Sequence, residues 1–348
     1  MPTLRVILAL PFLLASLSTH ALWAQDKSDG PTDPKARKTY EKALKYVHER
    51  NTLSAFDEFK KADKQDGGHC LDCQIKMIGY GIQFAEWKTA ELAAAEMLAE
   101  AKSNKETALA HYEFALVLVE EGLQKRKEEL FARAHEESSK ALAAVANFPD
   151  ALWADGVALA HLGKDDAAKS SFEQYVKIRP ADDARRQRAL RFISRPELVR
   201  AKMAPPFAVN TADGQRISLD GLQGKVVLVD FWATWCEPCR EALPHIREIA
   251  KKFQGQSLVI LSVSLDADEQ KWKEFVGKHE MTWPQYRDGG FAGPIATMFA
   301  VHAIPHTFTI DADGVLQEEH IGDASVEGKL KKLIARAREL QPTEAVVK

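Results

Sequence analysis

The sequence predicts a two-domain protein, with an all-α domain of helical repeats followed by an α/β domain around a central mixed sheet. Three observations predict this fold class. The chain has 348 residues, which is enough for two hydrophobic cores. Residues 36–199 carry apolar side chains at helical spacing and contain no convincing strand pattern. Residues 203–340 alternate short β-branched runs with amphipathic stretches, which is typical of strands alternating with helices.

Five segments are expected along the chain. Two proline-containing breaks, Arg195-Pro196 and Ala204-Pro205-Pro206, interrupt helical order and indicate the domain boundary. We expect a signal peptide at 1–24, a disordered polar lead-in at 25–35, the helical repeat domain at 36–200, the α/β domain at 201–341 and a tail at 342–348.

The N-terminus has the pattern of an export signal. Arg5 precedes an apolar run from Val6 to Leu17, which is long enough for a signal h-region and too short to span a bilayer. We expect cleavage after Ala24, with Ala21 as the second choice, and an uncleaved membrane anchor is the alternative. Export predicts a periplasmic or secreted protein, in a compartment where cysteine pairs tend to be oxidised unless a reductant is supplied.

Charge and composition argue against a nucleic-acid-binding protein and against a zinc site. The formal net charge is −3 at pH 7, and no basic block is interleaved with aromatic side chains. We therefore expect no nucleic-acid partner. Zinc needs about four ligands, and no second Cys/His pair at ligand spacing lies near Cys236 and Cys239. No metal and no other cofactor is expected.

The central motif is Trp235-Cys236-Glu237-Pro238-Cys239-Arg240, between an apolar run at Val226–Ala233 and an amphipathic stretch at Glu241–Phe253. The run predicts a buried strand and the stretch a helix. Unpaired N–H groups and the helix dipole favour a thiolate at such a turn, which makes Cys236 the nucleophile. A structural disulfide or half of a zinc site is the alternative, but this placement is typical of a redox dithiol.

A repeat of 34 residues is visible in the helical region. Pro149–Asp182 is the best copy, Ala36–His69 follows its spacing, and Leu71–Ser103 and Glu106–Phe148 are poorer copies, the last with an insertion at Gln124–Glu129. The region resembles the tetratricopeptide repeat family, which implies a concave surface that binds a protein or peptide ligand. A plain helical bundle used as a spacer is the alternative. The best copy carries the small, bulky and proline positions at Leu152, Gly156, Leu159, Ala168, Phe172 and Pro180.

A second cysteine pair, Cys70 and Cys73, opens the second repeat. A local structural disulfide is the main expectation for an exported protein. A second redox site and a metal site using His69 are the alternatives.

Further along, residues 179–202 carry eight Lys/Arg against three Asp/Glu. We expect a solvated capping helix there, with a membrane-surface or acidic-partner patch as the alternative.

The α/β domain resembles a known superfamily. Val229–Cys239 is similar to the active-site segment of the thioredoxin superfamily. Ala204–Phe207, Gln270–Phe299 and Ile304–Asp311 resemble its TlpA/ResA-type branch of exported redoxins. The resemblance implies a thioredoxin-like fold over about residues 204–340.

The resemblance also implies roles for individual residues. Cys236 is the attacking thiol and Cys239 the buried resolving thiol. Pro305 is a cis-proline facing them, and Asp230 is the buried acid that takes the proton from Cys239, with an ordinary strand-end aspartate as the alternative. The expected substrate groove consists of Trp235, Glu237, Pro238, Ile304 and His306.

One position departs from the ResA/TlpA pattern. Close relatives carry a glutamate three residues after the second cysteine, where this chain has Ala242. Glu241 is one residue earlier, about 100° around a helix, so it is not expected to replace that glutamate. We therefore expect Asp230 alone to carry the acid–base role. The charge of Glu237 opposes a thiolate at Cys236 and predicts a reducing couple.

The predicted function is an exported thiol-disulfide oxidoreductase, acting as a reductant. Its expected partners are disulfide-containing protein substrates, a membrane-bound thiol electron donor and a ligand on the repeats. A thiol peroxidase of the AhpC/TSA type is one alternative, although Thr234 does not stand at the spacing such enzymes use before Cys236. A repeat-based adaptor with a non-catalytic redoxin domain is the other.

Overall fold

The computed structural model describes residues 30–49, 51–181, 183–322 and 326–340. The predicted signal peptide (1–24) and tail (342–348) lie outside the described residues. The chain divides into two compact units: unit 1 consists of Met1–Ala181 and Phe192–Arg200, and unit 2 of Asp182–Arg191 and Ala201–Lys348. The predicted fold class is confirmed, since helices alone come first and a mixed five-stranded sheet follows. None of the described helices has both the length and the apolar character that a membrane span requires.

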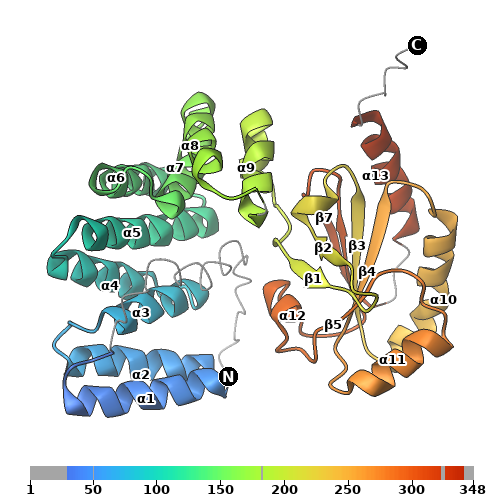
Figure 1. Ribbon diagram of the computed structural model, residues 1–348, viewed down its shortest axis with the longest axis horizontal. Coiled ribbons are helices and arrows are strands. Elements are labelled where there is room, and N and C mark those ends of the chain that lie inside the picture. Colours follow the sequence, from blue (N-terminus) through green and yellow to red (C-terminus); the bar gives the residue numbers. More distant parts are fainter. Residues whose placement is uncertain (1–29, 50, 182, 323–325, 341–348) are drawn as a thin grey trace. The chain divides into compact units, whose positions relative to one another are not determined.

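Helical hairpins follow one another through unit 1 (Figure 1). The first helix begins at Pro34 and not at Ala36, because the Asp33 carboxylate accepts two N–H groups of the first turn and proline is favoured there. The Asp33 N–H in turn donates to Asp66 at 2.7 Å, so the end of the expected disordered lead-in is ordered. The helices are α1 (Pro34–His48), α2 (Thr52–Gln65), α3 (Leu71–Gln83), α4 (Trp87–Glu100), α5 (Asn104–Lys125), α6 (Glu128–Ala144), α7 (Pro149–His161), α8 (Asp165–Ile178), α9 (Ala184–Ser194) and η3 (Pro196–Arg200).

Small residues allow the helices of a hairpin to approach each other. A Cβ atom on Gly156 of α7 would lie 2.7 Å from the ring of Phe172 on α8, so only glycine permits this contact. The small and bulky positions of the sequence repeat therefore meet in space. The predicted insertion at Gln124–Glu129 spans the turn between α5, which ends at Lys125, and α6, which begins at Glu128, and Arg126 adopts a left-handed conformation there.

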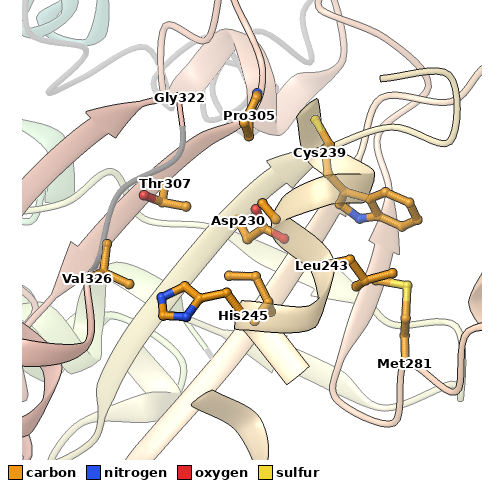
Figure 2. A pocket seen from close by; sticks show the side chains of 12 residues that line it. Asp230, Cys239, Leu243, His245, Met281, Pro305, Thr307, Gly322 and Val326 are labelled. Carbon is orange, nitrogen blue, oxygen red and sulfur yellow. The ribbon is translucent and has the colours of Figure 1, made fainter. Parts of the chain in front are cut away.

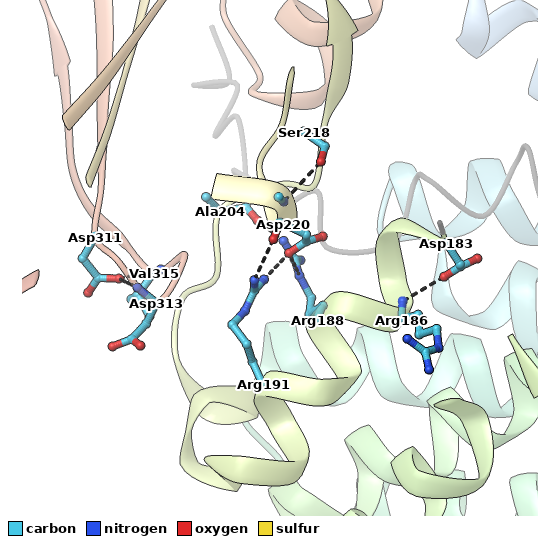
Figure 3. A network of polar contacts seen from close by, with 11 residues as sticks. Asp183, Arg186, Arg188, Arg191, Ala204, Ser218, Asp220, Asp311, Asp313 and Val315 are labelled. Atoms are coloured by element: carbon cyan, nitrogen blue, oxygen red, sulfur yellow. Dashed lines mark hydrogen bonds and ion pairs between the residues drawn. The ribbon is translucent and has the colours of Figure 1, made fainter. Parts of the chain in front are cut away.

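Two arginines of α9 are buried in unit 2 (Figure 3). The Arg188 guanidinium donates to Asp220 Oδ1 at 3.3 Å and to the Ala204 carbonyl at 3.1 Å. Arg191 forms an ion pair with the same carboxylate. The expectation that 179–202 is solvated is wrong for these two side chains, because a carboxylate distant in sequence is buried beside them.

The sheet of unit 2 has the strand order β5-β4-β3-β6-β7. The central strand β3 is parallel to β4 and antiparallel to β6, and all of its residues are buried, as expected for an apolar run covered on both faces. Its register places Asp230 beside Ser262 of β4 and Thr307 of β6. The strands are β1 (Ala208–Asn210), β2 (Arg216–Ser218), β3 (Val226–Trp232), β4 (Leu258–Ser264), β5 (Gln285–Arg287), β6 (His306–Ile310) and β7 (Leu316–Ile321).

Helices cover both faces of this sheet, with α10 and α13 on one side and α12 on the other (Figure 1). Asp268 caps α11 as predicted, by accepting the N–H of Lys271 at 3.1 Å. The predicted turn at Asp311–Gly314 joins β6 to β7. The helical segments are η4 (Asp220–Leu222), α10 (Glu237–Lys252), α11 (Glu269–Lys278), α12 (Pro294–Met298) and α13 (Glu327–Leu340).

Candidate active site

The dithiol motif lies where β3 ends and α10 begins, as the sequence predicts. The helix starts at Glu237 and not at Glu241, so both cysteines belong to its N-terminal turn. Cys236 is the N-cap, and its sulfur accepts the backbone N–H of Cys239 at 3.2 Å. Proline is favoured in the first turn of a helix, and Pro238 was the signal for this earlier start.

Cys236 and Cys239 form a disulfide, with their Cα atoms 5.3 Å apart. Each cysteine residue is only 5% exposed. Trp235, Glu237 and Pro238 are exposed beside it, so the predicted groove residues of the motif surround the disulfide on the surface. An incoming molecule therefore meets these three side chains next to the sulfur atoms.

Asp230 is a buried carboxylate in the middle of the sheet. Its Oδ2 atom accepts the Ser262 hydroxyl at 3.0 Å, and the Ser262 oxygen accepts the Trp283 indole N–H at 2.8 Å. Burial raises the pKa of Asp230 to about 6, and the hydrogen bond from Ser262 offsets part of that rise. Asp230 therefore changes protonation close to neutral pH, as a group that exchanges protons in catalysis must.

A small cavity brings together three of the four predicted catalytic residues, all except Cys236 (Figure 2). Asp230, Cys239 and Pro305 all line it. Its volume is about 30 Å³, which is enough for an ordered water molecule. Cys239 is thus the cysteine that shares a cavity with the buried acid.

Pro305 enters this site from the loop before β6, and the Ile304–Pro305 peptide bond is cis. Ile304 is partly buried and packs against the core of unit 2. His306 differs from its expected position in a substrate groove. Its side chain is buried, stacked on Phe308 and 3.2 Å from Glu319, so it does not face the surface. The reason is that His306 is the first residue of β6, where its ring lies on the same buried face of the sheet as Phe308.

Ala242 is the position at which the sequence departs from the expected family pattern. It lines the cavity together with Asp230 and Cys239, at the position where the family resemblance led us to expect a glutamate. Glu241 is exposed on the other side of α10 and does not line the cavity. Of the carboxylates in the described residues, Asp230 is the one that reaches this cavity.

Two residues near the site were not singled out from the sequence. His245 lines the same cavity, one turn along α10 from Ala242. Phe291 is exposed, with its ring 6.5 Å from that of Trp235. Helical spacing from the cysteines was the signal for His245, whereas nothing local in the sequence indicates that Phe291 lies beside Trp235.

Comparisons with known proteins indicate the family of this chain. The AhpC/TSA family matches residues 201–319. A solved thiol-disulfide oxidoreductase from Bacteroides fragilis is 27% identical, with a TM-score of 0.35, over 38% of this chain and 99% of that chain. Thioredoxin-like protein YneN of Bacillus subtilis is 31% identical over 38% of this chain and 77% of the relative. Thiol-disulfide oxidoreductase ResA of Bacillus cereus is 32% identical over 41% of this chain and 83% of the relative. The chain is a ResA-like thiol-disulfide oxidoreductase of the thioredoxin superfamily.

The second cysteine pair of this ResA-like oxidoreductase lies in unit 1. Cys70 and Cys73 form a disulfide at the start of α3, with Cα atoms 5.2 Å apart. Both residues are almost completely buried in the helical core, so an external thiol has no direct access to them. His69, the residue considered for a metal site, lies 3.2 Å from Glu100 instead. A structural role for this disulfide remains a prediction.

Replacing both Cys70 and Cys73 with alanine is expected to lower the free energy of unfolding of unit 1 by about 2 kcal/mol, the loop entropy of a short cross-link. The rate of disulfide reduction should stay at the wild-type value. The matched control is the Cys236→Ala/Cys239→Ala variant, which should lose that rate and keep unit 1 stable. Denaturant unfolding and a turnover assay on both variants check the prediction, and lost turnover in the first variant would contradict it.

Proposed function

We propose that this chain is an exported thiol-disulfide oxidoreductase that reduces disulfides in protein substrates through Cys236 and Cys239. The observation that supports this most is the single cavity that Cys239, Asp230 and Pro305 share at the start of α10. The cavity brings together the resolving thiol of Cys239, the carboxyl group of Asp230, whose pKa is about 6, and Pro305, the proline expected from the thioredoxin resemblance.

The first step is attack by the Cys236 thiolate on one sulfur of the substrate disulfide. A bond forms between Cys236 and that sulfur, the substrate S–S bond breaks, and the other substrate sulfur leaves as a thiolate that takes up a proton. The N-cap position favours the thiolate form of Cys236, because the N-terminus of α10 carries partial positive charge.

The second step releases the substrate. The Asp230 carboxylate accepts the proton of the Cys239 thiol, and the resulting thiolate attacks the Cys236 sulfur. The Cys236–Cys239 disulfide forms, the mixed disulfide breaks, and the second substrate sulfur leaves as a thiolate. Two electrons pass from the protein to the substrate, so a thiol donor must then reduce the protein. We assign that role to a membrane-bound thiol donor, in keeping with export.

The helical hairpins of unit 1 are proposed to be tetratricopeptide-like repeats that hold a client or a partner protein. The contact between Gly156 and Phe172 supports this, because it pairs the small and bulky positions of the repeat pattern. The segments proposed are the signal peptide at 1–24, the repeats at 36–200 and the redoxin domain at 201–341. The apolar run after Arg5 supports export to the periplasm or the medium.

The direct experiment is reduction of insulin disulfides by the full chain, with dithiothreitol as the electron source. Wild-type protein should accelerate the reaction, and Cys236→Ser should not exceed the background rate. Arg240→Gln, a neighbouring exposed residue of α10, is the control variant and should retain turnover. Wild-type rates for Cys236→Ser would refute the proposed function.

The couple is expected to be reducing. The exposed carboxylate of Glu237 lies next to Cys236 and opposes the thiolate, so the disulfide form is favoured. A redox titration against glutathione should give a potential near that of thioredoxin, ~−270 mV, and far from the ~−120 mV of DsbA. Glu237→Lys should raise the potential. A DsbA-like value for the wild type contradicts the assigned direction.

A further inference from the structure

The cavity beside the dithiol contains polar groups that the two-step reaction does not use. His245 Nε2 and Trp232 Nε1 are buried atoms for which the described part of the chain offers no hydrogen-bond partner. Both residues line the cavity together with Asp230 (Figure 2). A cavity of about 30 Å³ with a carboxylate and two unpaired ring nitrogens in its wall suits a hydrogen-bonded water molecule.

Asp230 needs a route for its proton. Its side chain is buried in the sheet, so it cannot exchange a proton directly with bulk solvent. Ala242, which also lines the cavity, supplies no titratable group. Among the described residues that line the cavity, the other titratable groups are Cys239 and His245.

His245 is also partly exposed. It interacts electrostatically with Glu327 at the start of α13, and Glu327 is itself paired with Lys252 on the surface. The Glu327 side chain is 35% exposed, so this end of the path is in contact with water. Imidazole side chains accept and release protons near neutral pH, which suits a group between a buried acid and solvent.

We propose that His245 relays the proton of Asp230 to solvent. After Cys239 gives its proton to Asp230, the protonated carboxyl passes it through water in the cavity to His245, and the imidazolium releases it beside Glu327. Asp230 returns to the carboxylate form, and no electrons move in this part of the cycle. His245 acts through Asp230, and this role rests on the proposed function.

The test follows the full chain between pH 5 and 9 in two assays. Single-turnover oxidation of the reduced chain by oxidised glutathione, followed by tryptophan fluorescence, has an amplitude that reports formation of the Cys236–Cys239 disulfide and tests the proposed function. The relay returns Asp230 to the carboxylate form after Cys239 has reacted, so the rate of repeated turnover with insulin and dithiothreitol, and its pH profile, test His245. His245→Ala should turn over about 10-fold more slowly at pH 7. Added imidazole should restore the rate, because it fits the space left by the missing ring.

Two further variants separate a proton relay from a structural role. His245→Gln keeps most of the side-chain volume, so it should fold, remain about as slow as His245→Ala and gain nothing from imidazole. Adding Ala242→Glu to His245→Gln should restore the rate and shift its pH profile. His279→Ala is the matched control, since His279 stacks on Phe275 away from the cavity, and it should behave as wild type.

Wild-type rates in both His245 variants would overturn the relay. So would a loss of rate that is uniform across pH and that neither imidazole nor Ala242→Glu restores, because that pattern indicates a structural role. A missing amplitude in the wild-type protein would instead reject the proposed function itself.

Discussion

Asp230→Asn is expected to slow disulfide exchange about 100-fold at pH 7, because the resolving thiol loses its proton acceptor. In the wild type the rate should rise with pH through about 6, where the Asp230 carboxylate becomes available, and then level off. The Asp230→Asn variant should lack this rise of the rate with pH. The measurement is the rate of single-turnover oxidation as a function of pH.

The same substitution should increase stability. The pKa of Asp230 is raised to about 6 from the ordinary 3.8, so the folded state binds the proton more tightly than the unfolded chain does. Stability therefore falls as the pH rises from about 4 to about 6, and at pH 7 the charged carboxylate destabilises the fold by up to about 3 kcal/mol. Asparagine carries no such charge.

Asp230→Asn is thus expected to lower the rate of disulfide exchange and to raise the stability of the fold. A variant that gains stability has not lost its rate through misfolding. Asp311→Asn is the matched control: Asp311 is also a buried carboxylate of unit 2, but it accepts N–H groups of its own turn and does not line the cavity. Its rate should match the wild type. An unchanged rate and pH profile in Asp230→Asn would show that another group accepts the proton.

Asp220→Ala is expected to have the largest effect on stability. It leaves the guanidinium groups of Arg188 and Arg191 buried without their carboxylate, which costs about 3–5 kcal/mol. Burial already lowers the pKa of Arg188, and the attraction of Asp220 opposes that shift. Hydrogen exchange of the β3 amides should report the loss, because a central strand opens only when unit 2 unfolds.

An exposed ion pair of the same chain is the control. Asp165 and Arg200 lie 2.6 Å apart at the surface of unit 1, and Asp165→Ala should cost less than about 1 kcal/mol. Replacing Arg188 and Arg191 with methionine in the Asp220→Ala background should recover most of the lost stability, since an apolar cluster needs no counter-charge. A loss below 1 kcal/mol in Asp220→Ala would mean that solvent reaches the two arginines.

Features encoded in neighbouring residues were predictable from the sequence. The apolar run at Val226–Ala233 predicted β3, and the dithiol was predicted to lie at a strand-to-helix turn. The helix cap at Asp268 and the turn at Asp311–Gly314 follow from local residue preferences. The start of α10 at Glu237 was also predictable, since Pro238 favours a first helical turn. The predicted helix began at Glu241 instead, because the helical spacing of apolar residues begins after Cys239.

Features that depend on the packing of distant segments were not predictable. The hydrogen bond from Ser262 to Asp230 needs the register of β3 against β4, which no local pattern fixes. Arg188 was predicted to be solvated because its partner, Asp220, is 32 residues away in the sequence. The buried position of His306 likewise depends on how β6 packs in the sheet, not on its neighbours in the sequence.

Trapping of the mixed disulfide tests the central claim most directly. Cys239→Ala, expressed as the full chain and isolated under acid quench, should carry substrate proteins joined through a disulfide to Cys236, as mapped by mass spectrometry. The Cys236→Ala/Cys239→Ala variant should carry none. Substrates joined to Cys70 or Cys73, or no trapped substrate at Cys236, would contradict the account.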